Sequence, residues 1–217
     1  MTQKISPLTD EKTMRFFQRA VELLVGHQYL IFLSHAIKPV SFMEHEFDYH
    51  LDDLSPGSNV FKPSLLLYGY SIELLLKSMF VFNTQNLEDT IKWDHNIKGL
   101  LDKISILYGK KFPDFYYKFF EQYEQIIVWS GRYPFPKRPQ KPIDDLVLMQ
   151  EKTKEVWVNL LDTFTETFDN EQLDNFKTLV WLTLGEFISS DIVTNQDFYD
   201  ATVKIALGRI KSVSLIL

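Results

Sequence analysis

The sequence contains no cysteine, which excludes several kinds of site at once. Disulfides, thiolate catalysis and cysteine-based zinc or iron–sulfur centres all need that side chain. A chain of 217 residues without disulfides suits a reducing compartment, and residues 1–12 lack the apolar core of a secretion signal. We therefore expect a cytoplasmic protein with no membrane partner.

Glycine is scarce, with 8 residues in the chain, and no glycine-rich phosphate loop, dinucleotide fingerprint or Gly-x-Ser-x-Gly elbow is present. Rossmann enzymes and the hydrolases built on these motifs are therefore excluded. The net charge of −6 means that any contact with nucleic acid has to be local. His45 and His50 are five residues apart and do not match the helical zinc motif, whose histidines are four apart. We expect neither a metal site nor a cofactor.

What the chain does contain is typical of helices. Hydrophobic residues make up 45% of it, enough for a sizeable core, and they recur at three- and four-residue intervals. No segment alternates with a period of two, so we predict an all-α protein. We expect about seven helices, with a four-helix bundle in residues 1–142 and a C-terminal helical extension, residues 143–217, packed on it. The predicted helices span about residues 10–38, 63–82, 95–108, 113–129, 143–168, 171–188 and 196–210.

Turn and cap residues set the expected ends of several helices. The run Ser-Pro-Gly-Ser at residues 55–58 predicts a turn, with the second helix starting later, at about Pro63. Asp94 is the expected cap of the third helix, and Gly109 is expected to end it. Asn170 and Asn195 occupy the positions where caps of the last two helices belong.

The longest apolar run, residues 65–82, contains one charged pair. Glu73 and Lys77 are four residues apart and therefore share one face of a helix. Because charges are costly in hydrocarbon, this pair favours a buried core helix over a membrane span. Either the two residues form a structural ion pair, or Glu73 lines a cleft and orients a base or a ligand. His95, at the predicted start of the third helix, could face the same cleft.

Residues 130–142 form a basic, proline-rich segment without any acidic residue. Cations suit phosphate groups, and aromatic rings between cations suit stacked bases. The segment is either a contact for RNA or nucleotides, or a solvated connector that meets acidic helices of the same chain. Its cations are Arg132, Lys137, Arg138 and Lys141, with Tyr133 and Phe135 between them.

Three strings carry a resemblance to a known family: GYSIELLLKSMF at residues 69–80, HNIKGLLDKI at 95–104 and GRYP at 131–134. Together they resemble the HEPN superfamily of small helical-bundle domains over residues 64–136. Its members are RNA-cleaving toxins, defence modules or nucleotide-binding modules, and they are commonly dimeric. The resemblance implies a shared cleft formed by Glu73, Lys77, His95 and Arg132.

Within that resemblance, Glu73, His95 and Arg132 are the candidate catalytic residues. The ribonuclease branches use an Arg followed by a His with four to six residues between them. No His follows Arg132, and seven residues separate Arg19 from His27, so that signature is absent. The candidate ligand-binding residues are Lys77, Tyr133, Lys137, Arg138 and Lys141.

The leading functional hypothesis is a non-catalytic or atypical HEPN-like module that binds RNA, a nucleotide or a protein partner. One alternative is a ribonuclease or nucleotide-processing toxin or defence enzyme with a non-standard site. There His95 would act as acid and base, and Arg132 would stabilise the developing negative charge. The other alternative is a structural homodimer that associates through the aromatic fourth helix.

Overall fold

The computed structural model describes residues 11–36, 56–85, 95–125 and 146–188, and these residues form six α-helices and no strand. The predicted all-α class is therefore confirmed for this part of the chain. The predicted helix at residues 196–210, its expected cap Asn195 and the stretch with His45 and His50 lie outside the described residues. The helices are α1 (Glu11–Ala36), α2 (Pro56–Thr84), α4 (Ile97–Tyr108), α5 (Asp114–Gln125), α6 (Leu146–Thr165) and α7 (Asn170–Ile188).

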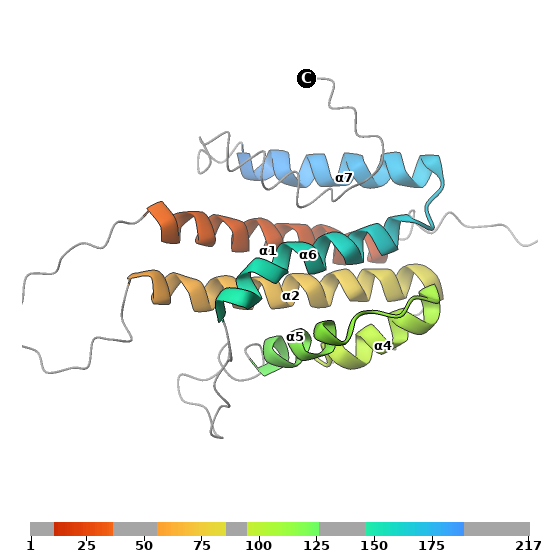
Figure 1. Ribbon diagram of the computed structural model, residues 1–217. Helices are drawn as coiled ribbons and strands as arrows, with labels where there is room; N and C mark the ends of the chain where they lie inside the picture. The colour runs from red at the N-terminus through yellow and green to blue at the C-terminus, as the bar shows by residue number, and fades with distance from the viewer. Residues whose placement is uncertain (1–10, 37–55, 86–94, 126–145, 189–217) are drawn as a thin grey trace, which may run out of the picture.

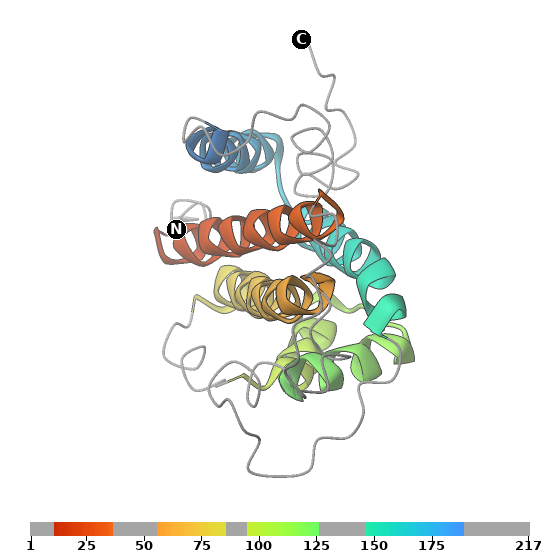
Figure 2. The same ribbon diagram turned by 90° about the vertical axis from the view of Figure 1, so that its left-hand side faces the viewer.

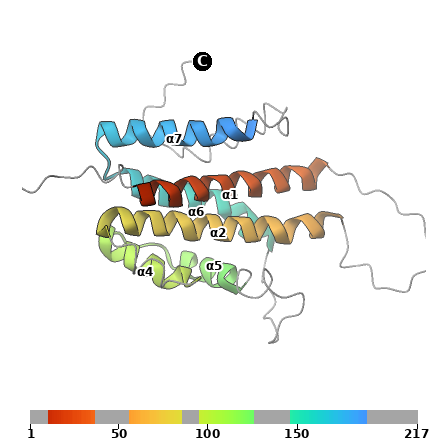
Figure 3. The ribbon, with the colours of Figure 1, turned by 180° about the vertical axis from the view of Figure 1, so that it is seen from behind.

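The central helix is α2, which packs against four others (Figure 1). Its most extensive contact is with α1, and the two helices lie side by side along most of their length. Figure 2 shows α4 and α5 on the side of α2 away from α1, while α7 covers the outer side of α1. Helix α6 packs on α2 and runs along the α1–α2 pair, as the reverse view in Figure 3 also shows. A helix surrounded in this way must be apolar on nearly every side, as α2 is.

One hydrophobic core joins all six helices. Residues from both sides of position 142 contribute to it, although the predicted boundary there lies outside the described residues. The division into a bundle and an extension stays a prediction. Aromatic rings fill much of the core, as the composition suggested. Buried core residues, one from each helix in chain order, are Phe17, Leu75, Leu101, Phe120, Trp157 and Phe176.

The predicted turn at residues 55–58 is wrong for its last three residues, because α2 already begins at Pro56. Proline at the first helical position loses nothing, since its missing N–H would have no partner there anyway. Pro63, the predicted start, lies inside the helix instead. It is exposed there, and its ring removes one backbone donor from the helix.

The start of α4 also differs from the prediction. The cap is Asn96, whose Oδ1 accepts a hydrogen bond of 2.8 Å from the Gly99 amide. The expected cap, Asp94, lies outside the described residues, and His95 precedes the helix with a left-handed φ of 58°. The end of α4 is as predicted: Gly109 has φ 61° and ψ 26°, the conformation of a glycine C-cap.

Helix α7 begins with a reciprocal cap at Asp169, one residue before the predicted cap. Asp169 Oδ1 accepts from the Gln172 amide at 2.8 Å, and Gln172 Oε1 accepts from the Asp169 amide at 3.0 Å. This is a capping box, in which two backbone donors of the first turn are satisfied by two side chains. Asn170, the expected cap, is the first helical residue.

One segment of α2, Pro63–Thr84, is long and apolar enough to cross a membrane by length and composition. In the structure, 72% of its most apolar window is buried inside the protein. The core helix of a soluble protein has the same signature as a membrane span. The location of the chain therefore stays a prediction.

His27 is a core histidine that links α1 to α2. It is 1% exposed, its Nδ1 lies 2.8 Å from the Ser64 carbonyl oxygen, and its ring lies 5.1 Å from that of Tyr68 between centroids. Burial lowers the pKa of His27 from 6.5 to about 4, and the bond to Ser64 opposes that change only in part. The native protein therefore holds this ring in its neutral form.

We expect the free energy of unfolding to fall as the pH is lowered from 6.5 to about 4. In that window the unfolded chain binds a proton at His27 that the native protein does not, so stability increases with pH. Below the window the loss is complete and amounts to about 3 kcal/mol. Urea unfolding followed by circular dichroism at neutral pH and near pH 4 measures it.

The matched variant is His27→Asn, which keeps an N–H donor for the Ser64 carbonyl and cannot titrate. Its stability should differ less between the two pH values, by about the same 3 kcal/mol. Equal pH dependence in the two proteins would show that His27 is not the group responsible.

Candidate functional site

Three of the predicted site residues meet at the carboxylate of Glu73. Lys77 Nζ donates to Glu73 Oε1 at 2.6 Å, and His95 Nδ1 lies 2.9 Å from Glu73 Oε2. Each oxygen of the carboxylate therefore has its own partner. The side chains of Glu73, Lys77 and His95 are 6%, 13% and 14% exposed, so the cluster is largely removed from water.

Local and long-range structure both contribute to this cluster. Lys77 is one helical turn after Glu73 and reaches it within α2. His95 comes from 22 residues further along, where its left-handed backbone places the ring against α2 just before α4 begins. Tyr70 packs its ring edge-on against His95, with centroids 5.7 Å apart. Tyr70 and Glu73 are three residues apart on one face of α2, so this face holds the His95 ring at two points.

The cluster determines which nitrogen of His95 carries a proton. An ionised carboxylate only accepts hydrogen bonds, so Nδ1 must be the donor toward Glu73. In the neutral ring, Nε2 is then the basic nitrogen. A carboxylate that orients a histidine in this way is the arrangement that a general base requires. The same contact also keeps the ring in one orientation.

Two further residues, one beside His95 and one at the start of α4, were not predicted from the sequence. Tyr70 is one, and its three-residue spacing from Glu73 is the signal that could have indicated it. The other is Glu124 on α5, whose Oε1 accepts from the Lys98 amide at 2.7 Å and so stabilises the start of α4. Burial raises the pKa of Glu124, and its bonds to the first turn of α4 oppose that shift. No local spacing relates Glu124 to Lys98, so this contact could not be predicted.

The remaining predicted site residues lie in the basic segment 130–142, outside the described residues. Their roles stay predictions. Among the residues that the structure describes, no three His, Asp or Glu side chains come together in a group that could hold a metal ion. The predicted site residues within the basic segment 130–142 are Arg132, Tyr133, Lys137, Arg138 and Lys141.

Comparison of the chain with family models, with curated proteins and with solved structures found no match. The resemblance to the HEPN superfamily therefore rests on the three strings at residues 69–80, 95–104 and 131–134.

Proposed function

We propose that this chain is a HEPN-like helical module that binds RNA through the Glu73–Lys77–His95 cluster and the basic segment 130–142. The observation that supports it is that the two oxygens of the Glu73 carboxylate contact Lys77 and His95, one each. The resemblance groups Glu73, Lys77 and His95, and the contact between Glu73 and His95 is not a consequence of sequence proximity. It agrees with what the resemblance implies.

The chemistry of both parts suits a phosphate-bearing ligand. Glu73 takes up one N–H of the Lys77 ammonium, which has three, and holds the His95 ring in place. Polar groups held in this way lose little conformational entropy when a ligand binds. The basic segment adds four cations with two aromatic residues among them, a composition that suits phosphates and stacked bases. Because the whole chain carries −6, binding must be local to these residues.

The orientation of His95 also favours the enzymatic alternative, since a histidine held by a carboxylate can act as a general base. The Arg-to-His spacing of the ribonuclease branches is absent from the chain. Binding is therefore the proposal, and cleavage is the alternative that the same experiment tests.

The decisive measurement is the affinity for a labelled single-stranded RNA, by fluorescence anisotropy over a series of salt concentrations. Replacing Arg132, Lys137 and Arg138 together by alanine should weaken binding at low salt. It should also reduce the slope of log K against log salt by about 2, because each phosphate contact to a single strand contributes about 0.7.

The matched control replaces Lys103, Lys118 and Lys154, which are exposed on α4, α5 and α6. It changes the net charge by the same amount and should leave the slope unchanged. Equal slopes in the two triple variants, or no binding by the unmodified chain, would contradict the proposal. The recovered RNA is then run on a denaturing gel. Cleavage by the unmodified chain but not by His95→Gln would replace binding with the enzymatic alternative.

A further inference from the structure

The backbone of His95 has an uncommon conformation just before the first turn of α4. Its φ of 58° lies in the left-handed region, which residues other than glycine seldom occupy. Such a conformation persists only where the surrounding contacts require it. On the ring side, these contacts are with Glu73 and Tyr70. On the chain side, the next residue is Asn96, the cap of α4.

Two hydrogen bonds fix Asn96 to the first turn of α4. Its carbonyl oxygen accepts from the Leu100 amide at 3.0 Å, and its Oδ1 accepts from the Gly99 amide at 2.8 Å. A cap residue has non-helical backbone angles, and those of Asn96 are φ −87° and ψ 74°. The helix therefore begins after Asn96, and His95 stays outside it.

The absence of a side chain at Gly99 allows the Asn96 side chain to lie over this turn. A β-carbon at position 99 would lie 2.7 Å from Asn96 Nδ2, 2.8 Å from its Oδ1 and 2.9 Å from its Cγ. These distances are well inside van der Waals contact, so any other residue would displace the Asn96 side chain and break the capping bond. Glycine inside a helix is otherwise unfavourable. The cap therefore depends on the space that Gly99 leaves.

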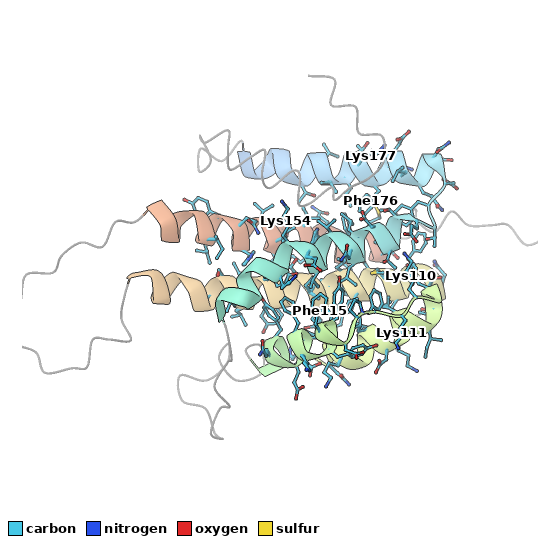
Figure 4. All side chains as sticks on the ribbon, viewed as in Figure 1. Lys110, Lys111, Phe115, Lys154, Phe176 and Lys177 are labelled. Carbon is cyan, nitrogen blue, oxygen red and sulfur yellow. The ribbon has the colours of Figure 1, made fainter. Side chains whose placement is uncertain are left out.

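The rest of α4 is anchored independently of this cap. Glu124 on α5 accepts from the Lys98 amide at 2.7 Å. After the other end of the helix, Lys110 Nζ lies 2.5 Å from Glu166 Oε2 on α6. Figure 4 shows Lys110 in the segment between α4 and α5. Loss of the Asn96 side-chain bond should therefore leave the helix in place and act on the junction just before it.

We propose that Asn96 and Gly99 are positioning residues for His95. The Asn96 side chain keeps the start of α4 after His95, and Gly99 leaves the space that this side chain needs. Together they hold the His95 ring with Nδ1 toward Glu73. The consequence for RNA rests on the proposed function: a cluster whose His95 ring is displaced from Glu73 binds RNA less tightly.

Long-range ¹H–¹⁵N NMR spectra of the full chain measure the orientation of His95, at a pH above the usual range of histidine titration. Donation to Glu73 makes Nδ1 the protonated ring nitrogen and Nε2 the unprotonated one, so their signals are well separated. Asn96→Ala and Gly99→Ala should each reduce or reverse that separation. Asn96→Ser, which keeps an oxygen acceptor for the Gly99 amide and adds no charge, should preserve it. The spectrum of His95→Gln identifies the two signals.

The matched control removes a cap from another helix. Asp169→Ala loses the bond from the Gln172 amide at the start of α7, which lies on the opposite side of the α1–α2 pair from α4. It should lower the melting temperature about as much as Asn96→Ala does, and leave the His95 signals unchanged. Circular dichroism first shows that each variant is folded. Unchanged His95 signals in either Asn96→Ala or Gly99→Ala would overturn the proposal, and so would an equal change in Asp169→Ala.

RNA affinity separates this inference from the proposed function. By fluorescence anisotropy, Asn96→Ala and Gly99→Ala should weaken RNA binding as His95→Gln does, by about two- to tenfold, and Asn96→Ser should not. Altered ring signals with unchanged affinity would support the positioning of His95 and contradict the assignment of RNA to the cluster. Unaltered ring signals would overturn the positioning and leave the proposed function standing.

Discussion

Replacing Phe164 by alanine is expected to lower the free energy of unfolding by about 3–5 kcal/mol. Phe164 is completely buried on α6 and touches four other phenylalanine rings. Their centroids lie between 4.9 and 6.3 Å away, and they come from α1, α2, the segment after α6, and α7. The four rings belong to Phe17, Phe82, Phe168 and Phe176.

The loss has two components: the transfer of the ring out of water, and the cavity left among side chains that can only partly relax. Since domains of this size are stable by about 5–15 kcal/mol, the variant should keep only a small margin. Phe164→Leu retains most of the volume and should lose less, about 1–2 kcal/mol. Chemical unfolding followed by circular dichroism measures both.

The control for this prediction is Leu182→Ala. Leu182 is 64% exposed on α7, and its truncation should change stability by less than about 0.5 kcal/mol. If Phe164→Ala cost no more than Leu182→Ala, the packing of α6 and α7 described above would be wrong.

Removing the carboxylate of Glu73 is the second change with a large expected effect. Glu73→Leu leaves Lys77 and His95 buried without their common acceptor, and should cost about 3–5 kcal/mol. Lys77→Met should cost less, about 1–3 kcal/mol, because Glu73 keeps its bond to His95. The double variant Glu73→Leu/Lys77→Met removes the uncompensated lysine charge. It should therefore be more stable than the sum of the two single losses predicts.

A matched ion pair on the surface shows how much burial matters. Arg19 and Glu22 are 2.5 Å apart on α1, and the arginine side chain is 64% exposed. Glu22→Gln should change stability by about 0–1 kcal/mol, because solvent screens such pairs. Strictly additive losses in the Glu73 and Lys77 variants, measured by urea unfolding, would show that the buried pair is not coupled.

Features that depend on neighbouring residues could be predicted well. The stripe of Phe17, Val21 and Leu24 on the first helix is buried as its spacing predicted. Gly109 ends α4 because a left-handed residue is needed there and glycine adopts it without strain. Glu73 and Lys77 meet because residues four apart in any helix are neighbours.

Where the prediction was wrong, local signals pointed both ways. Ser-Pro-Gly-Ser is typical of a turn, but a proline also starts a helix well, and α2 begins at Pro56. The order Asp94-His95-Asn96 offers two possible caps, and the choice of Asn96 leaves His95 outside the helix with its left-handed backbone. That choice directs the His95 ring at Glu73. Only the packing of α4 against α2 could decide it.

Sequence patterns were enough to predict the helical class of this protein, the apolar faces of its helices, and the charged pair within its most apolar helix. All three follow from a period of 3.6 residues and from interactions within one turn. Only the packing of the helices could decide that His95 contacts Glu73 and that Lys110 joins the segment between α4 and α5 to Glu166 on α6. An apolar stripe specifies which side of a helix is buried but not which helix covers it, so contacts between distant segments depend on how the helices pack.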